Sequence, residues 1–328
     1  MSAAPVAGRP GGRAPAHPAV AEFAAEVGET GPVAARGKGT AWTVGGHLAP
    51  EVRIVAAPAG VVDHTPAEMT VRVLAGTPVA ELDAVLADRG QRCALPERGG
   101  TVGGAVAVGH DHLSRRGRGT VAASVLQVRY VSAEGRVITG GGPTVKNVTG
   151  FDLPRLMVGS LGTLGLVAEV ILRTNPRPVT ACWLRSDDAD PFSAGTTVLR
   201  PGSVLWDGGS SWVELEGHAP DVAADRARLG RLGHWVEVGG PPPLPPHRWS
   251  LTPARLRDLV PGTAEGSEPL PLREPGTFVA SIGVGTVWSA AAPPPRTVSP
   301  PVAALSARLK HNFDPDGRLA PGRSLGRS

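Results

Sequence analysis

Three glycine-rich segments in the first half of the sequence have residues suited to binding an anion. They lie at 36–40 (Arg-Gly-Lys-Gly-Thr), 96–109 and 159–165. Glycine lets neighbouring N–H groups converge and lets the backbone approach a ligand closely, so a phosphate or pyrophosphate is the ligand that such segments favour. Each segment alone is also typical of an ordinary turn, whereas three of them in one half of the chain favour a shared ligand.

The familiar nucleotide-binding motifs do not account for these segments. A P-loop requires Gly-x4-Gly-Lys-Ser/Thr, which the sequence lacks. Gly37 and Gly39 are followed by Trp42 where a dinucleotide fingerprint has its third glycine, and the segment 159–165 has a different spacing and precedes a strand. The pattern therefore indicates another phosphate-binding architecture.

Helices and strands alternate around these segments. Apolar spacing predicts helices at 19–27 and 77–89, the second with Thr77 as N-cap. Alternating or continuous apolar runs predict strands at 52–55, 69–75, 125–131, 136–139 and 166–173. After Pro178 the patterns weaken and prolines cluster, with strands expected at 212–215 and 277–284 and a helix at 305–313. A domain boundary is therefore predicted near residue 178.

Composition narrows the class of protein. The 328 residues are 41% hydrophobic and 19% charged, with a net charge of +4 and no dense basic stripe, which argues against a nucleic-acid partner. Cys93 and Cys182 are far apart, so no metal site or iron–sulfur cluster is expected within the chain. No apolar run is long enough to span a membrane, and residues 1–18 lack the apolar core of a secretory signal. We therefore expect a cytoplasmic protein, which would attach to the inner face of the membrane only through partners.

The order of the segments resembles a known family. Residues 33–178 resemble the FAD-binding domain of flavoproteins of the vanillyl-alcohol-oxidase, or p-cresol-methylhydroxylase, type, and most closely the small FAD-binding subunits of bacterial glycolate oxidases. The resemblance is carried by 36–42 (Arg-Gly-Lys-Gly-Thr-Ala-Trp), 101–109 (Thr-Val-Gly-Gly-Ala-Val-Ala-Val-Gly), 146–153 (Lys-Asn-Val-Thr-Gly-Phe-Asp-Leu), 159–165 (Gly-Ser-Leu-Gly-Thr-Leu-Gly) and the tail 313–323.

The resemblance implies an α+β fold in which a two-subdomain FAD-binding domain is joined to a smaller α+β cap domain. The implied organisation is a flexible leader at 1–18, the FAD-binding domain at 19–178, the cap at 179–300 and a tail at 301–328 that returns to the first domain. The cap is expected to cover the isoalloxazine ring of the flavin.

The resemblance also implies noncovalent FAD as the cofactor. Backbone amides at 37–40 and 101–104 are expected to contact the pyrophosphate, the strand around Val167 is expected beside the cofactor, and Lys146 and Asn147 are expected to brace their loop. His47 lies beyond the first segment, which contains no residue able to link the flavin covalently. The expected cofactor-binding residues are Arg36, Gly37, Lys38, Gly39, Thr40, Thr101, Gly103, Gly104, Ala107, Gly109, Gly162, Thr163, Gly165 and Val167.

Three departures from the family pattern bear on activity. Lys38 stands where many relatives have glycine, so the loop either keeps ordinary dihedral angles there or has an altered geometry. Ala122 and Ala123 replace the family's Arg-Asp pair, and Ala320 replaces an asparagine. These departures weaken the expectation of catalysis more than that of the fold.

No catalytic residue is assigned from the sequence. His110 and His112 follow the second segment, and alternation would place both on one side of an extended chain, near the flavin or in a solvated loop. Arg115, Arg116 and Arg118 are equally suited to a carboxylate substrate or to a partner surface. No metal site is predicted.

Three functions remain open. The first is a subunit of a flavin-dependent 2-hydroxyacid (glycolate-type) dehydrogenase, with a larger flavin subunit and an iron–sulfur subunit as partners. The second is a self-sufficient flavin oxidoreductase that acts on another alcohol or sugar-type substrate. The third is a scaffold that has kept the fold and lost FAD.

Overall fold

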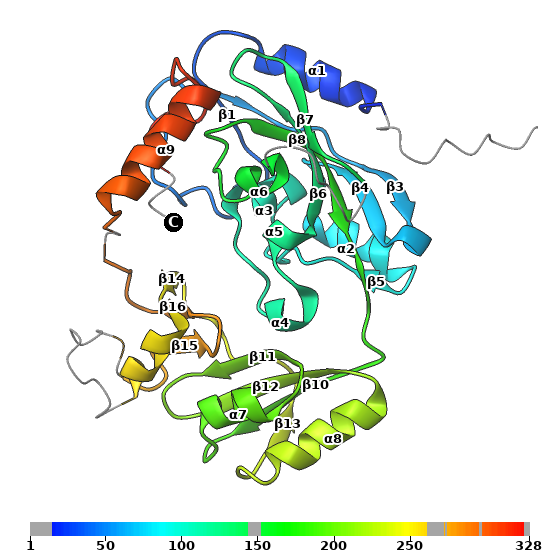
Figure 1. Cartoon of the computed structure of the whole chain (residues 1–328), viewed down its shortest axis with the longest axis vertical. Helices are drawn as coiled ribbons and strands as arrows, with labels where there is room; N and C mark the ends of the chain where they lie inside the picture. The colour runs from blue at the N-terminus through cyan, green and yellow to red at the C-terminus, as the bar shows by residue number, and fades with distance from the viewer. Residues whose placement is uncertain (1–14, 144–151, 261–271, 273, 295–296, 325–328) are drawn as a thin grey trace, which may run out of the picture.

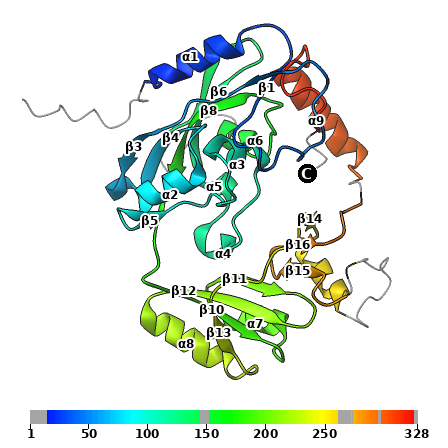
Figure 2. The ribbon, with the colours of Figure 1, turned by 180° about the vertical axis from the view of Figure 1, so that it is seen from behind.

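The computed structural model describes residues 15–143, 152–260, 272, 274–294 and 297–324. Figures 1 and 2 show two lobes, each built on its own antiparallel sheet with helices packed against it. The α+β class predicted from the sequence is therefore confirmed. No helix in the described ranges is long and apolar enough to cross a membrane.

The first lobe holds a five-stranded sheet in the order β3-β4-β8-β6-β7. Its strands are β3 (Val61–Thr65), β4 (Thr70–Leu74), β6 (Val125–Val131), β7 (Val137–Gly141) and β8 (Leu166–Arg173). The largely apolar sequence of β8, which is interrupted by the buried Glu169, suits its place in the centre of the sheet, where both of its faces are buried. Two smaller sheets flank it, one of β1 (Val33–Ala35) with β2 (Arg53–Val55) and one of β5 (Gln91–Arg92) with β9 (Asn175–Pro176).

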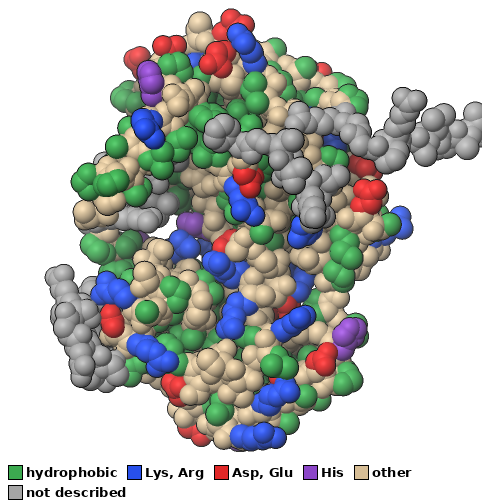
Figure 3. All heavy atoms as spheres, viewed as in Figure 1, with side chains coloured by type: hydrophobic (Ala, Val, Ile, Leu, Met, Phe, Trp, Pro, Cys, Tyr) green, Lys and Arg blue, Asp and Glu red, His purple; other side chains and the backbone are tan. Residues whose placement is uncertain are grey.

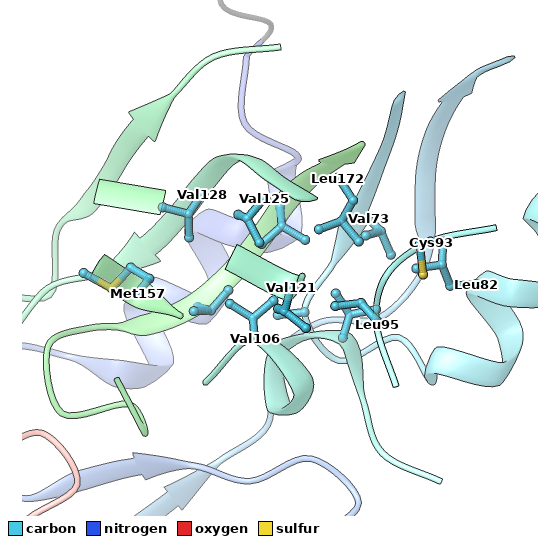
Figure 4. Close-up of a cluster of buried hydrophobic side chains, with 14 of the residues drawn as sticks. Val73, Leu82, Cys93, Leu95, Val106, Val121, Val125, Val128, Met157 and Leu172 are labelled. Carbon is cyan, nitrogen blue, oxygen red and sulfur yellow. The ribbon is translucent and has the colours of Figure 1, made fainter. Parts of the chain in front are cut away.

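Helices cover both faces of this sheet. Helix α1 (Pro18–Val27) packs its Val20, Phe23 and Val27 on one face, against a cluster that includes Leu166 and Ala168 of β8. On the other face lie α2 (Val79–Ala87), α3 (Val102–Val108), α5 (Val121–Ser124) and α6 (Leu153–Met157). Figure 4 shows their apolar side chains turned toward those of β4, β6 and β8, so this face carries the largest core of the lobe.

One local prediction in this lobe was wrong, and one segment has more regular structure than its glycines suggested. Thr77 does not cap α2: its hydroxyl donates to Leu74 O at 2.7 Å and accepts from Gly60 N at 2.8 Å, and Pro78 occupies the N-cap position. Within the second glycine-rich segment, Val102–Val108 forms α3 with Thr101 as its N-cap. Lys146 and Asn147 lie outside the described residues.

The second lobe holds a seven-stranded sheet in the order β13-β10-β12-β11-β15-β16-β14. Its strands are β10 (Thr180–Ser186), β11 (Pro201–Trp206), β12 (Ser211–Gly217), β13 (Val236–Val238), β14 (His247–Ser250), β15 (Phe278–Ser281) and β16 (Thr286–Ser289). Helices α7 (Pro191–Thr197) and α8 (Ala219–Leu229) and the 3₁₀-helix η2 (Pro253–Leu259) pack on one face of it. The other face turns toward the first lobe, where α4 (Arg115–Arg118) packs against β11 (Figure 1).

The chain returns to the first lobe after this sheet. Helix α9 (Pro300–Phe313) leads to a tail in which Leu319 bridges to Val33 in parallel and Ala320 N donates to Val33 O. Arg318 is buried, and all five of its N–H groups donate to carbonyl oxygens, of Val27, Gly28, Thr30, Gly31 and Ala133, at 2.7–3.1 Å. This one side chain therefore ties the tail to the end of α1.

We predict that Arg318→Met lowers the free energy of unfolding of the first lobe by about 3 kcal/mol or more, because the substitution leaves buried carbonyl oxygens without donors. Urea unfolding followed by tryptophan fluorescence measures the change. Arg308→Met, at an exposed position of α9, is the matched control and is expected to change the free energy by less than about 0.5 kcal/mol. Equal behaviour of the two variants would contradict the role given to Arg318.

Candidate functional site

A cleft of about 810 Å³ lies between the glycine-rich segments of the first lobe and strands β14 and β16 of the second. This volume is in the range of pockets that hold cofactors and drug-sized ligands. Figure 3 shows Lys and Arg side chains gathered around the hollow between the lobes. The cleft is the place where segments far apart in the sequence come together.

The first segment presents unused backbone donors to the cleft. The N–H groups of the five consecutive residues 37–41 take part in no hydrogen bond recorded among the described residues, although all five residues line the cleft. The turn closes after them, where Trp42 N donates to Gly39 O at 3.2 Å. Gly39 has a φ of +74°, whereas Lys38 is not among the residues with positive φ. The loop thus keeps ordinary dihedral angles at Lys38, the first of the two alternatives considered for this departure.

The first segment packs closely against the start of the second segment. Gly37 lies so close to Thr101 that an added Cβ would overlap the threonine hydroxyl. The same is true of Gly103, where a Cβ would stand 2.7 Å from Ala75 Cβ. Glycines at these positions therefore allow close contact between backbone segments that side chains would separate.

The N–H groups at 102–104, which the sequence suggested as pyrophosphate ligands, already donate to partners within the protein. Val102 N donates to Thr77 O at 2.9 Å, Gly103 N donates to Ala75 O at 2.7 Å and Gly104 N donates to the Thr101 hydroxyl at 3.2 Å. These bonds arise because the segment folds as the first turn of α3, whose leading N–H groups find partners inside the protein. The expected amide contacts from 102–104 to a pyrophosphate are therefore not supported.

Most of the residues predicted from the sequence meet in the cleft. Twelve of the fourteen line it: Arg36, Gly37, Lys38, Gly39, Thr40, Thr101, Gly103, Gly104, Ala107, Gly162, Gly165 and Val167. Gly109 does not, because it ends α3 with a φ of +69° against the backbone of Gly159. Thr163 does not line it either, because this residue is buried. Its hydroxyl donates to Ser160 O, and its carbonyl oxygen accepts from Lys310 Nζ.

The charge of the cleft is one-sided. Five of its lining residues are Arg or Lys, namely Arg36, Lys38, Arg98, Arg248 and Arg323, and none of the lining residues is Asp or Glu. Arg36 and Arg323 lie over the Trp42 ring, with guanidinium carbons 5.2 and 4.3 Å from its centre. This lining favours a ligand with several negative charges.

Several of these residues were missed or left undecided in the sequence. Arg248 and Trp288 had no signal, because they lie in the weakly patterned second half, and Arg98 was given no role although it lies within the second glycine-rich segment. Trp42 and Arg323 stood inside the quoted motifs but were given no role. Ala122 and Ala123 lie in α5 and do not line the cleft, so their departure from the family pattern leaves the lining unchanged.

Of the two histidines after the second segment, only His110 lines the cleft. His110 lines the cleft, and burial, together with the charges of Arg248 and Arg98, lowers its pKa to about 4. His112 turns away, and its Nδ1 accepts from Ser114 N at 2.9 Å. Alternation therefore did not hold for this pair. The described part of the chain contains no group of three or more His, Cys, Asp or Glu side chains able to hold a metal ion.

The arginines of α4 lie between the lobes and outside the cleft lining. Arg115 pairs with Asp111 at 2.9 Å, and Arg116 Nη2 donates to Gly195 O at 3.4 Å. Burial lowers the pKa of Arg118, which lies near the charges of Arg92 and Glu214. The contacts of Arg115 and Arg116 give these two side chains a structural role at the junction, whereas Arg118 Nε is buried without a hydrogen-bond partner among the described residues.

Comparison with known proteins identifies the first lobe. Residues 16–141 match the family of FAD binding domains. Glycolate oxidase subunit GlcE of Escherichia coli (strain K12) is 34% identical over 181 residues, which make up 52% of this chain and 52% of that protein. D-lactate dehydrogenase of Archaeoglobus fulgidus is 39% identical over 77 residues, 24% of this chain and 17% of that protein. The chain thus spans about half the length of GlcE and less of the second relative.

The fold extends the likeness to both lobes. A solved structure of alkyldihydroxyacetonephosphate synthase superposes with a TM-score of 0.63 at 14% identity, covering 92% of this chain and 73% of that one. At this identity the match shows the fold alone. It includes the second lobe, whose sequence patterns are weak.

The residues of the cleft fit an FAD molecule. The pyrophosphate needs several donors in a small volume, and the free amides at 37–41 and the neighbouring cations supply them. Three buried polar atoms on lining residues, His110 Nε2, Trp288 Nε1 and Arg323 Nε, have no hydrogen-bond partner among the described residues, as expected for a cleft that receives a polar ligand. Residues 16–141 therefore match an FAD-binding domain, in agreement with the resemblance found in the sequence.

Proposed function

We propose that the chain binds FAD without a covalent bond and is a subunit of a flavin-dependent dehydrogenase or oxidase of 2-hydroxy acids of the glycolate type. The observation that supports this most directly is the row of unused N–H groups at 37–41 in a cleft lined by cations and by no carboxylate. The relatives named as glycolate oxidase subunits and as D-lactate dehydrogenase support the substrate class.

In this proposal each domain has a separate role in binding the cofactor or the substrate. We place the FAD-binding domain at 19–178, the cap at 179–300 and the returning tail at 301–328. The amides at 37–41 hold the pyrophosphate, while Arg36, Lys38 and Arg323 balance its charge. Gly162, Gly165 and Val167 offer backbone with little bulk beside the cofactor. Bound FAD would supply the hydride acceptor, and the protein would bind, orient and shield the substrate.

The absence of a covalent link is part of the proposal. His47 is exposed and does not line the cleft, and both Cys93 and Cys182 are buried outside the lining. The chain's one tyrosine, Tyr130, is buried behind Gly165, so closely that a Cβ on Gly165 would overlap its ring. His110 and His247 are the histidines that line the cleft.

The proposed partners are a larger flavin subunit and an iron–sulfur subunit. The two cysteines of this chain are far apart in the sequence and both are buried, so the chain itself offers no thiolate cluster for onward electron transfer. The relative that matches over 52% of this chain is itself named as a subunit of glycolate oxidase. The complex would work in the cytoplasm.

An absorbance spectrum of the purified chain tests the cofactor. We expect flavin peaks near about 370 and 450 nm that move to the supernatant after acid precipitation, as for any noncovalent flavin. Flavin that stays in the pellet would contradict the noncovalent link. A colourless protein that takes up no added FAD would favour the scaffold, and turnover of the isolated chain with a dye acceptor would favour the self-sufficient enzyme.

Gly37→Ala tests the close contact under the first segment. The added Cβ would overlap the Thr101 hydroxyl and displace the amides at 37–41, so we expect the dissociation constant of FAD to rise at least about tenfold, near 1.4 kcal/mol. Fluorescence titration of the apoprotein with FAD measures it, and circular dichroism checks the fold.

Two further variants make this prediction specific. Adding Thr101→Ala to Gly37→Ala leaves Thr101 Cβ as the nearest atom, at 3.2 Å, and should restore part of the affinity. Gly239→Ala places the same methyl group where no atom lies within 4 Å and should leave FAD binding unchanged. A single variant with wild-type affinity would show that the contact does not set the geometry of the site.

A further inference from the structure

The tail that returns from the second lobe contacts the chain on both sides of the first glycine-rich segment. Before the segment, Val33 O accepts from Ala320 N at 2.8 Å. After it, Gly45 O accepts from Ser324 N at 3.0 Å. Residues 319–324, which we call the latch, therefore hold the backbone that enters and leaves the row of unused N–H groups.

A tight turn shapes the latch. Arg323 N donates to Ala320 O at 3.2 Å, and Pro321 and Gly322 occupy the two central positions, an order that type II turns favour. Gly322 has a φ of +91°, and a Cβ on it would stand 2.5 Å from His47 O. Glycine is thus required twice at this position, for the dihedral angle of the turn and for its approach to the neighbouring backbone.

Arg323 connects the turn after the first segment with the third segment. Its Nη2 donates to Trp42 O at 3.0 Å and its Nη1 donates to Leu161 O at 3.4 Å. The guanidinium carbon also lies 4.3 Å from the centre of the Trp42 ring. The two connected stretches touch directly as well, since a Cβ on Gly45 would stand 2.3 Å from Leu161 Cδ1. One side chain of the latch therefore cross-links two walls of the cleft.

Two residues at these contacts have strained backbones. Leu161 has a φ of +55° and Ala320 a φ of +44°, a region that is unfavourable for residues with a Cβ other than Asn and Asp. Such conformations persist where the surrounding contacts hold them, and they cluster at sites that clamp a ligand. Leu161 is held from two sides, because its N–H donates to Ala107 O at 2.8 Å and its carbonyl oxygen accepts from Arg323.

The N–H groups at 37–41 need support of this kind. They donate to no acceptor recorded among the described residues, so their own hydrogen bonds do not fix the shape of the stretch. Thr101 packs against Gly37 at its start, and the latch holds the chain that follows it. A segment that is already ordered loses less freedom when a ligand binds, so these contacts favour binding.

We propose that the latch, acting through Arg323, holds the N–H groups at 37–41 in position for the pyrophosphate and thereby raises the affinity for FAD. This inference rests on the proposed binding of FAD and deepens it by giving the returning tail a positioning role. Arg323 lines the cleft, whereas Gly322 and the rest of the latch do not. Because coupling between two sites is reciprocal, bound FAD stabilises the latch in return.

Gly322→Ala tests the latch without changing a charge or a lining residue. The added Cβ would overlap His47 O and displace the turn that directs Arg323, so we expect the dissociation constant of FAD to rise at least tenfold. Fluorescence titration of the apoprotein measures it. Gly317→Ala is the matched control, because Gly317 lies in the same tail with a φ of +67° and no atom within 4 Å of an added Cβ. It introduces a similar backbone strain outside the latch and should change the affinity less than threefold.

A double variant tests whether the latch acts through Arg323. Arg323→Met alone should also raise the dissociation constant at least tenfold. If Gly322 works by directing Arg323, the combination of Gly322→Ala and Arg323→Met weakens FAD binding less than threefold beyond Arg323→Met. Fully additive effects would overturn the action through Arg323.

Hydrogen exchange followed by mass spectrometry measures the latch in the chain without cofactor. The N–H groups of Trp42, Val44 and Gly46 are hydrogen-bonded within this turn, and Gly322→Ala should speed their exchange at least tenfold, whereas Gly317→Ala should not. In the wild-type chain, added FAD should slow exchange at 319–324. Exchange that is the same with and without FAD would contradict the coupling.

The failures of the two proposals are distinguishable. Wild-type affinity for FAD in Gly322→Ala would overturn the latch and leave the proposed function standing. Equal weakening in Gly317→Ala would reduce the effect to the stability of the tail and reject the assignment. A wild-type chain that takes up no FAD would overturn the proposed function, and the exchange rates of the apoprotein would still decide whether the latch orders the first segment.

Discussion

Gly37 and Thr101 belong to segments more than sixty residues apart, and no atom larger than hydrogen fits between the glycine Cα and the threonine hydroxyl. This close approach fixes the first segment beside the start of α3, and the N–H groups of residues 37–41, which line the cleft, make no hydrogen bond within the described part of the chain. Thr101 serves twice, since the same hydroxyl accepts from Gly104 N at the start of the helix. The position of the first segment at the cleft therefore depends on the close contact between the Gly37 backbone and the Thr101 side chain.

The treatment of charge differs sharply between the cleft and the rest of the molecule. Glu169 is fully buried in β8 and is paired with Arg129 and with Arg72, the latter at 2.9 Å, so three neighbouring strands share one neutralised group. Removing one partner of such a buried set leaves an uncompensated charge, which is strongly destabilising. In the cleft the cations have no acidic partner among the lining residues. Charges in the core of the first lobe are therefore paired within the protein, whereas the cations of the cleft are left for a ligand to neutralise.

The junction of the lobes depends on a similar pairing. Arg92 of β5 binds Glu216 of β12 through two bonds of 2.6 and 2.7 Å, and both side chains are almost entirely shielded from solvent. Gly117 of α4 lies against the same carboxylate, where a Cβ would overlap it. Because β14 and β16 belong to the same sheet as β12, this pair also sets how Arg248 and Trp288 face the first lobe.

The sequence by itself determined the α+β class and the resemblance of residues 16–141 to an FAD-binding domain, and twelve of the fourteen residues that it predicted line the cleft. Those features depend on local patterns: apolar periodicity in the strands, and glycines that recur in a fixed order. The resemblance of the tail 313–323 to the family's motif was also visible in the sequence, and Asp314 in it accepts from the N–H groups of Arg318 and Leu319. Only the tertiary structure decided which amides remain free, because hydrogen bonding at 102–104 depends on Thr77 and Ala75 from another part of the chain. It also decided that His110 faces the cleft while His112 does not, and that Arg248 and Trp288 join the site. Nothing local marks those residues, since their meeting depends on how two separately folded sheets are held together.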